Sequence, residues 1–132
     1  MMAGRTTTKT VVVVEDDQDD YLILQQLFRQ YCTDCITIPI HDSTTVVAEL
    51  DQLKVLPDLI LIDLIMPLQD GFEVLTQLRS HTRYAAVVIA IMSGLETPEY
   101  RARAVELGAD HYLIKPDSLS QADHFLTQLF GT

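Results

Sequence analysis

Leu59-Ile60-Leu61-Ile62-Asp63 is the stretch that decides the fold of this chain. Four large apolar residues in succession, without polar alternation, are typical of a strand covered on both faces in a parallel sheet. The run ends in a single acid, and open α/β sheets bind their ligands beyond the carboxyl ends of such strands. The stretch therefore predicts a buried central strand and makes Asp63 the candidate reactive group.

The rest of the chain alternates short apolar runs with segments of helical periodicity. The apolar runs predict strands at 10–14, 36–40, 58–63, 86–92 and 111–114. The periodic segments predict helices at 18–31, from Asp42 or Ser43 to Pro57, from Phe72 to about His81, from Thr97 to Gly108, and from Ser118 or Ser120 onward. Strict alternation of this kind implies one α/β domain, with a parallel sheet and helices on both faces. Pro39 suits an edge strand.

Composition limits the functional classes. The chain has 132 residues, enough for one domain, and 48% of them are hydrophobic, enough for a core. Its net charge of −10 argues against direct nucleic-acid binding and suits a metal ion or a basic protein surface. No apolar run is long enough to span a membrane. Residues 1–9 lack the apolar core of a signal peptide, so we expect a disordered leader and a cytoplasmic protein.

Cys32 and Cys35 form a C-x-x-C pair. In thioredoxin-type redox proteins this motif opens a helix just after a strand, whereas here it lies between a helical pattern and a strand. Even with His41 nearby, the pair supplies too few ligands for a structural zinc ion. We interpret both cysteines as ordinary thiols.

Polar residues follow the carboxyl ends of four predicted strands. They are Glu15 and Asp16 after the first, Asp63 at the third, Ser93 after the fourth and Lys115 after the fifth. Carboxylates that meet at one rim repel one another unless a cation neutralises them, and Mg²⁺ prefers oxygen ligands of this kind. Alternatively, the first two acids are solvated groups at a helix N-terminus, where acids are common.

Lys115 favours the site over that alternative. A lysine at the end of a buried strand requires an anionic partner, which Asp63 or a phosphoryl group on it would supply. Ser93 offers a hydroxyl donor to the same oxygens. A nucleophile, a metal, a cation and a hydroxyl are the components of phosphoryl transfer.

Over residues 10–130 the chain resembles the receiver domain of two-component response regulators, the CheY-like superfamily. The residues that carry the resemblance are Val13-Val14-Glu15-Asp16, Asp63-Leu64-Ile65-Met66-Pro67, Asp70-Gly71, Ser93-Gly94, Gly108-Ala109-Asp110 and Tyr112-Leu113-Ile114-Lys115-Pro116. The resemblance implies a receiver domain over 10–132. It also implies a doubly wound, flavodoxin-like (βα)5 fold whose five-stranded parallel sheet has the order 2-1-3-4-5.

The resemblance also implies the chemistry of the site. Asp63 would accept a phosphoryl group from a sensor histidine kinase or a phosphotransfer protein. The side chains of Glu15, Asp16 and Asp63 would hold Mg²⁺, with the main-chain carbonyl of Ile65 completing the set.

Further residues take roles by the same resemblance. Ser93, Gly94 and Lys115 would bind the phosphoryl oxygens, and Tyr112 is the aromatic expected to turn inward on phosphorylation. The Lys115–Pro116 peptide bond is expected to be cis, as some tight loops require.

The resemblance predicts a stand-alone signalling domain rather than an enzyme. Phosphorylation would change the affinity of the face formed by the fourth helix, fifth strand and fifth helix for a downstream effector protein, and the same face could support a homodimer. Ile65 and Leu95 are apolar where relatives often carry polar residues, so we expect slow hydrolysis of the acyl phosphate.

Two alternatives use the same residues. An aspartyl-phosphate phosphatase or phosphotransferase usually has a second acid two residues after its nucleophile, but position 65 is isoleucine. A pseudo-receiver scaffold would not be phosphorylated, and the full set of acids, serine and lysine argues against it.

Overall fold

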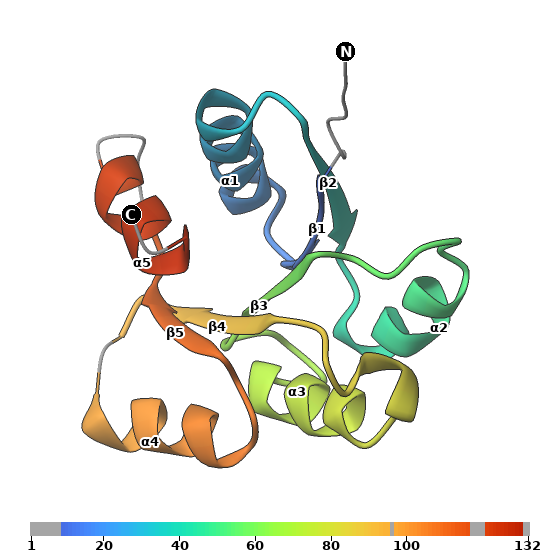
Figure 1. The fold of residues 1–132 in the computed structure, drawn as a ribbon. Coiled ribbons are helices and arrows are strands. Elements are labelled where there is room, and N and C mark those ends of the chain that lie inside the picture. Colours follow the sequence, from blue (N-terminus) through green and yellow to red (C-terminus); the bar gives the residue numbers. More distant parts are fainter. Residues whose placement is uncertain (1–8, 96, 117–120, 131–132) are drawn as a thin grey trace.

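A five-stranded parallel sheet forms the centre of the computed structural model, which describes residues 9–95, 97–116 and 121–130. Its strands lie in the order β2-β1-β3-β4-β5 (Figure 1). They are β1 (Lys9–Val14), β2 (Cys35–Ile40), β3 (Leu59–Asp63), β4 (Ile89–Ser93) and β5 (His111–Ile114). The predicted flavodoxin-like order is confirmed, and β2, which contains Pro39, is an edge strand.

Five α-helices cover the sheet on its two faces. They are α1 (Gln18–Tyr31), α2 (Val46–Asp51), α3 (Gly71–Arg79), α4 (Pro98–Glu106) and α5 (Ala122–Phe130). In Figure 1, α1 and α5 lie on one face of the sheet, and α2, α3 and α4 lie on the other. This arrangement confirms the doubly wound topology that the alternating pattern predicted.

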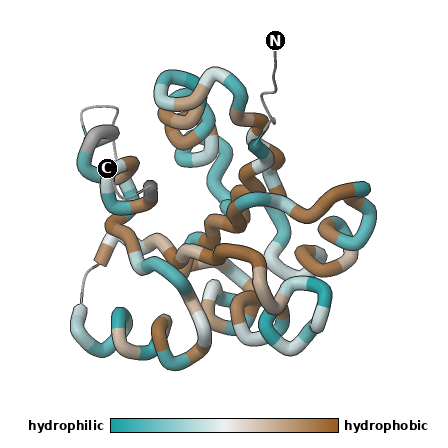
Figure 2. Tube along the Cα trace, in the orientation of Figure 1, coloured by the Kyte–Doolittle hydropathy of each residue, from teal (hydrophilic) through white to brown (hydrophobic). Residues whose placement is uncertain are grey.

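Each face of the sheet has its own hydrophobic core. Successive side chains of a strand point to opposite faces, so Val12 and Val14 pack on the side of α2, α3 and α4, whereas Val11 and Val13 pack on the side of α1 and α5. Figure 2 shows the apolar residues concentrated along the central strands and the hydrophilic ones on the outer parts of the helices. All five residues of β3 are buried, as its uninterrupted sequence predicted.

The same alternation positions the functional side chains. Leu61 of β3 and Leu113 of β5 belong to the core beneath α1 and α5. Two residues further along each strand, Asp63 and Lys115 continue on this face, as Glu15 does after β1. The strand ends therefore direct these charged groups toward the start of α1.

Capping residues start the helices close to the strand ends. The Asp17 side chain caps α1 by accepting hydrogen bonds from the backbone N–H groups of Asp19 and Asp20. Asp70 and Glu73 form a capping box at the start of α3. These acids satisfy helix N–H groups that have no partner within the helix.

Some predicted boundaries were wrong. β4 begins at Ile89 rather than at residue 86, because residues 82–84 form a 3₁₀ turn (η3) that buries Tyr84. Another 3₁₀ turn, η2 (Ser43–Thr45), precedes α2, which already ends at Asp51 and leaves Leu56 exposed. The predicted starts of the last helix, Ser118 and Ser120, lie outside the described residues.

The predicted cis peptide bond is also wrong. The described residues contain no cis peptide bond, so the Lys115–Pro116 bond is trans. Trans is the lower-energy form of most X–Pro bonds, and the cis expectation came from the resemblance alone. Cys32 and Cys35 are free thiols. No helix among the described residues is long and apolar enough to cross a membrane.

Candidate functional site

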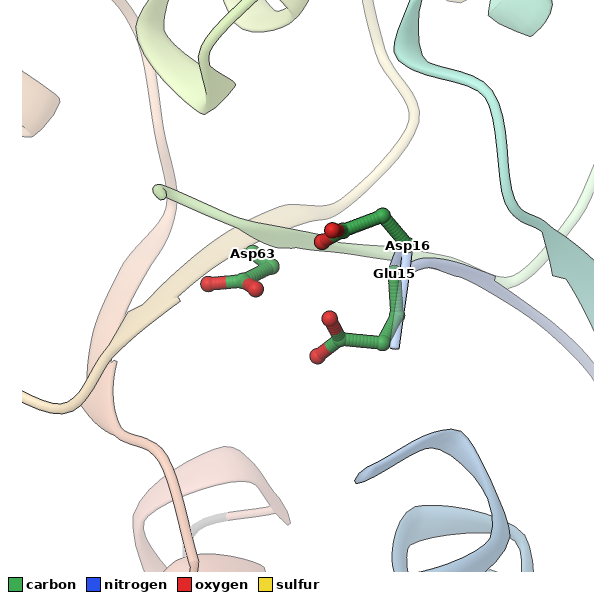
Figure 3. A group of neighbouring side chains, drawn as sticks. All are labelled: Glu15, Asp16 and Asp63. Atoms are coloured by element: carbon green, nitrogen blue, oxygen red, sulfur yellow. The ribbon is translucent and has the colours of Figure 1, made fainter. Parts of the chain in front are cut away.

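Three carboxylates gather at the carboxyl ends of the two central strands. Figure 3 shows Glu15 and Asp16, which follow β1, turned toward Asp63 at the end of β3. One carboxylate oxygen from each residue lies within 4.8 Å of the other two. Glu15 and Asp63 are buried, whereas Asp16 is exposed, so solvent reaches the group from the Asp16 side. The structure thus brings together the three acids that the sequence analysis selected.

Lys115 connects this group to the end of β5. Its ammonium nitrogen lies 3.0 Å from Oδ2 of Asp63 and 2.7 Å from Oε1 of Glu15. Its backbone N–H donates to the carbonyl oxygen of Ser93, at 2.8 Å, which joins the ends of β4 and β5. The strand-end lysine has the anionic partners that its burial requires.

Asp20 is a partner of Lys115 that the sequence analysis missed. Its Oδ2 lies 2.6 Å from the ammonium nitrogen, and it reaches the site from the first turn of α1. Several acids follow β1, and any of them could simply stabilise the N-terminus of the next helix, so the sequence does not distinguish Asp20 from the others. Side-chain alternation along β5 could have indicated this pairing, because it places Lys115 on the face of the sheet that α1 covers.

Burial dominates the electrostatics of Glu15. The pKa of this carboxyl is raised from 4.5 to about 8: burial is the largest cause, the neighbouring Asp63 adds to the rise, and Lys115 partly opposes it. Oε2 accepts a hydrogen bond from the backbone N–H of Asp17. Oε1 has no partner in hydrogen-bond geometry, despite the close Lys115 ammonium. A buried acid with an incompletely bonded oxygen beside two other carboxylates is a suitable environment for a divalent cation.

Lys115 is held in its charged form. Burial alone would lower its pKa, but the close carboxylates of Asp20, Glu15 and Asp63 outweigh burial, so the pKa lies above its usual value. The site therefore keeps a permanent positive charge beside the candidate nucleophile.

Asp63 is fixed on both sides of its carboxylate. Oδ2 accepts a hydrogen bond from Lys115, and Oδ1 accepts one from the backbone N–H of Ile65 at 3.3 Å.

The start of α3 packs tightly against the backbone of Asp63: a Cβ atom on Gly71 would lie 2.6 Å from the carbonyl oxygen of Asp63 and 2.8 Å from Cα of Leu64. Glycine at position 71 therefore allows α3 to begin directly against the end of β3, a role that the sequence analysis did not assign.

The structure does not bring every selected residue to the carboxylates. Ser93 is buried, and its hydroxyl accepts a hydrogen bond from the backbone N–H of Leu95; it has no hydrogen bond to Asp63 among the described residues. Gly94 is exposed and lines a cavity of about 340 Å³ together with Asp20 and Lys115. The binding of phosphoryl oxygens by Ser93 and Gly94 stays a prediction. Coordination of a metal ion by the main-chain carbonyl of Ile65 also stays a prediction.

Tyr112 lies in the core on the opposite face of the sheet from Lys115. Its side chain is buried, and its hydroxyl donates a hydrogen bond to the carbonyl oxygen of Leu95 at 2.7 Å. The guanidinium carbon of Arg101, on α4, lies 5.2 Å from the centre of the Tyr112 ring. These contacts join the loop after β4, helix α4 and strand β5. The predicted switch function of Tyr112 is not tested by this geometry.

Comparison with known proteins gives the family. The family model of the response regulator receiver domain matches residues 11–125, which include the acids, Ser93 and Lys115. The chain belongs to this family, a class of domains that act in two-component signalling.

Individual relatives agree with this assignment. A gliding motility regulatory protein of Myxococcus xanthus is 43% identical over 58 residues, or 44% of this chain. The chain spans only 8% and 27% of the lengths of the first two curated relatives it matches. The phosphorylated cyanobacterial phytochrome response regulator RcpA superposes with a TM-score of 0.82 at 24% identity, covering 96% of this chain and 97% of RcpA. The Mn²⁺-bound form of the response regulator Rcp1 superposes with a TM-score of 0.77 at 24% identity, covering 92% and 91%. Both structures share the fold.

Proposed function

We propose that this receiver domain is phosphorylated on Asp63 by a phosphohistidine of a sensor histidine kinase or phosphotransfer protein. The observation that carries the proposal is the convergence of Glu15, Asp16, Asp63 and Lys115 at one rim of the sheet. Family membership supports phosphoryl signalling at this rim rather than turnover of a small substrate.

The transfer needs one nucleophile and one leaving group. A carboxylate oxygen of Asp63 attacks phosphorus and forms the O–P bond of an acyl phosphate. The P–N bond of the phosphohistidine breaks, and its electron pair returns to the imidazole of the donor protein. Because Oδ1 and Oδ2 are each held by a hydrogen bond, the carboxylate is oriented before the donor arrives.

Glu15, Asp16, Asp63 and the Ile65 carbonyl would hold Mg²⁺. When bound, the metal ion neutralises negative charge on the carboxylates and on the transferring phosphoryl group. The Mn²⁺-bound form of Rcp1, which has the same fold, is consistent with a divalent metal here. The raised pKa of Glu15 is a second support, since a cation would relieve the cost of its buried negative charge.

Lys115, Ser93 and Gly94 would bind the phosphoryl oxygens after transfer. The phosphoryl group adds about 1.5 to 2 negative charges and new acceptor oxygens. The Ser93 hydroxyl, which accepts a hydrogen bond from the Leu95 N–H, would donate its own hydrogen to a phosphoryl oxygen, and Tyr112, whose hydroxyl donates to the Leu95 carbonyl, would respond to any shift of this loop. The face formed by α4, β5 and α5 would then change its affinity for an effector protein.

The test is incorporation of one phosphoryl group from acetyl phosphate, followed by intact-protein mass spectrometry. We expect a singly phosphorylated species with Mg²⁺, and none with a chelator or in Asp63→Asn. Asp34→Asn, a change of the same kind at an exposed position, should be phosphorylated like the wild type. Equal phosphorylation of Asp63→Asn would refute the proposal.

A further inference from the structure

We infer that Asp20 is a positioning residue of the phosphorylation site: it holds the Lys115 ammonium in the unphosphorylated protein and releases it when a phosphoryl group binds at Asp63. The inference rests on the proposed function and adds a residue to its mechanism. Asp20 lies on α1 and Lys115 follows β5, so release would break a contact between these two elements.

The inference starts from the number of donors on Lys115. An ammonium group has three N–H donors and no acceptor. Three carboxylates surround it, with oxygen atoms of Asp20, Glu15 and Asp63 at 2.6, 2.7 and 3.0 Å from the nitrogen. A phosphoryl oxygen that approaches Lys115 therefore competes with three carboxylates that already lie within ion-pair distance of its ammonium nitrogen.

Differences in exposure indicate which partner leaves. The side chain of Asp20 is 36% exposed, against 0% for Glu15 and 5% for Asp63. Water can solvate a released Asp20 carboxylate, whereas releasing either buried acid leaves a buried polar group without its partner. Exchange of Asp20 for a phosphoryl oxygen is therefore the least costly rearrangement.

The location of Asp20 gives it a second effect on the bound phosphoryl group. Asp20, Gly94 and Lys115 line the same cavity of about 340 Å³, beside the candidate phosphoryl site. A carboxylate there repels an anionic phosphoryl group and also competes for its cation. Both effects predict that Asp20 weakens binding of a phosphoryl group, so its removal should strengthen that binding.

Asp19 provides a matched control. It lies next to Asp20 in the first turn of α1 and carries the same charge, but its side chain is exposed. Among the described residues its side chain makes no hydrogen bond or ion pair with Lys115. Asp19→Asn therefore removes one charge from the same turn without removing a partner of Lys115.

The probe is beryllofluoride, a phosphoryl mimic, titrated at Mg²⁺ concentrations shown to saturate each variant. We expect Asp20→Asn to bind it about threefold more tightly or better, the effect of losing a partly exposed ion pair. Asp19→Asn should stay close to the wild type, and Asp20→Glu, which restores the carboxylate, should return toward it.

A second readout observes Lys115 directly in the metal-free protein. The chain has three lysines, Lys9, Lys54 and Lys115, so lysine side-chain carbon signals in NMR spectra can be assigned with Lys9→Arg and Lys54→Arg. Asp20→Asn should shift the Lys115 signal, and Asp19→Asn should leave it in place. In the wild type saturated with Mg²⁺, adding beryllofluoride should shift the same signal relative to its position with Mg²⁺ alone.

The outcomes separate the two proposals. Equal beryllofluoride affinities of Asp20→Asn and Asp19→Asn, or weaker binding by Asp20→Asn, would overturn the positioning function of Asp20 while leaving the phosphorylation site intact. An unchanged Lys115 signal in Asp20→Asn would also overturn the positioning function of Asp20. Failure of the wild type to bind beryllofluoride with Mg²⁺ would refute the proposed function and this inference with it.

Discussion

The ammonium nitrogen of Lys115 lies 3.0 Å from Oδ2 of Asp63, although 52 residues separate them in the sequence. β4 lies between the two strands that carry them, and the parallel arrangement brings all three carboxyl ends to one rim. This contact joins the candidate nucleophile to the last strand of the sheet. Removing the charge of either residue should therefore leave the other without its partner in a largely buried site.

Lys115→Met should destabilise the metal-free protein. The change leaves the buried acids Glu15 and Asp63 without their cation, and breaking a buried ion pair from one side costs about 3 kcal/mol or more. Urea unfolding in a chelator measures the effect, with Lys54→Met, an exposed lysine, as the control. Saturating Mg²⁺ should recover part of the loss. Equal unfolding midpoints for the two variants would show that the charge is not required.

The stability of the metal-free protein should fall as the pH rises from about 4.5 to about 8. The pKa of the Glu15 carboxyl is about 8 in the folded chain, against 4.5 for an ordinary glutamate such as that of the unfolded chain. Between these two pH values the folded state binds more protons than the unfolded state, so raising the pH favours unfolding. The predicted loss is on the order of a few kcal/mol. Lys115 stays charged throughout, because its pKa is raised.

Glu15→Gln isolates this contribution. The variant cannot titrate at position 15, so its stability should change less with pH, and at pH 8 without metal it should exceed that of the wild type. Urea midpoints at two pH values, with a chelator present, measure both quantities. A pH dependence identical to the wild type would assign the effect to other groups.

Gly71→Ala should destabilise the fold at the site itself. Its new Cβ would meet the backbone of Asp63 and Leu64 at 2.6 and 2.8 Å, and backbone atoms cannot move aside as a side chain can. We expect a loss of about 2 kcal/mol or more in the free energy of unfolding. Gly94→Ala is the comparison, because a Cβ there meets nothing within 4 Å. Similar stability for the two variants would contradict the tight packing of α3 against β3.

Hydrolysis of the acyl phosphate should be slow in the wild type and faster in Ile65→Asn. The Ile65 side chain is 60% exposed beside Asp63, where an amide could hold the attacking water and isoleucine cannot. Loss of the phosphoryl group with time after removal of the donor gives the rates. A wild-type half-life of seconds, or no acceleration in the variant, would count against this explanation.

Sequence reasoning located the strands with uninterrupted apolar runs and, through them, the residues at their carboxyl ends. Asp63 and Lys115 were found in this way because parallel strands place such residues on a common rim. Asp20 was missed because the acids after β1 differ only in which way their side chains point, and that depends on how α1 packs. The position of η3 was missed because burial of Tyr84, with its hydroxyl bonded to Asp51, depends on contacts distant in sequence.

The most direct measurement is the chemical location of the phosphoryl group. The protein is phosphorylated by acetyl phosphate with Mg²⁺, reduced with borohydride to convert the acyl phosphate to an alcohol, digested and mapped by mass spectrometry. Our account predicts homoserine at position 63 and unmodified aspartate at positions 16 and 20. Reduction at another acid with Asp63 intact, or no reduced residue in phosphorylated protein, would contradict it.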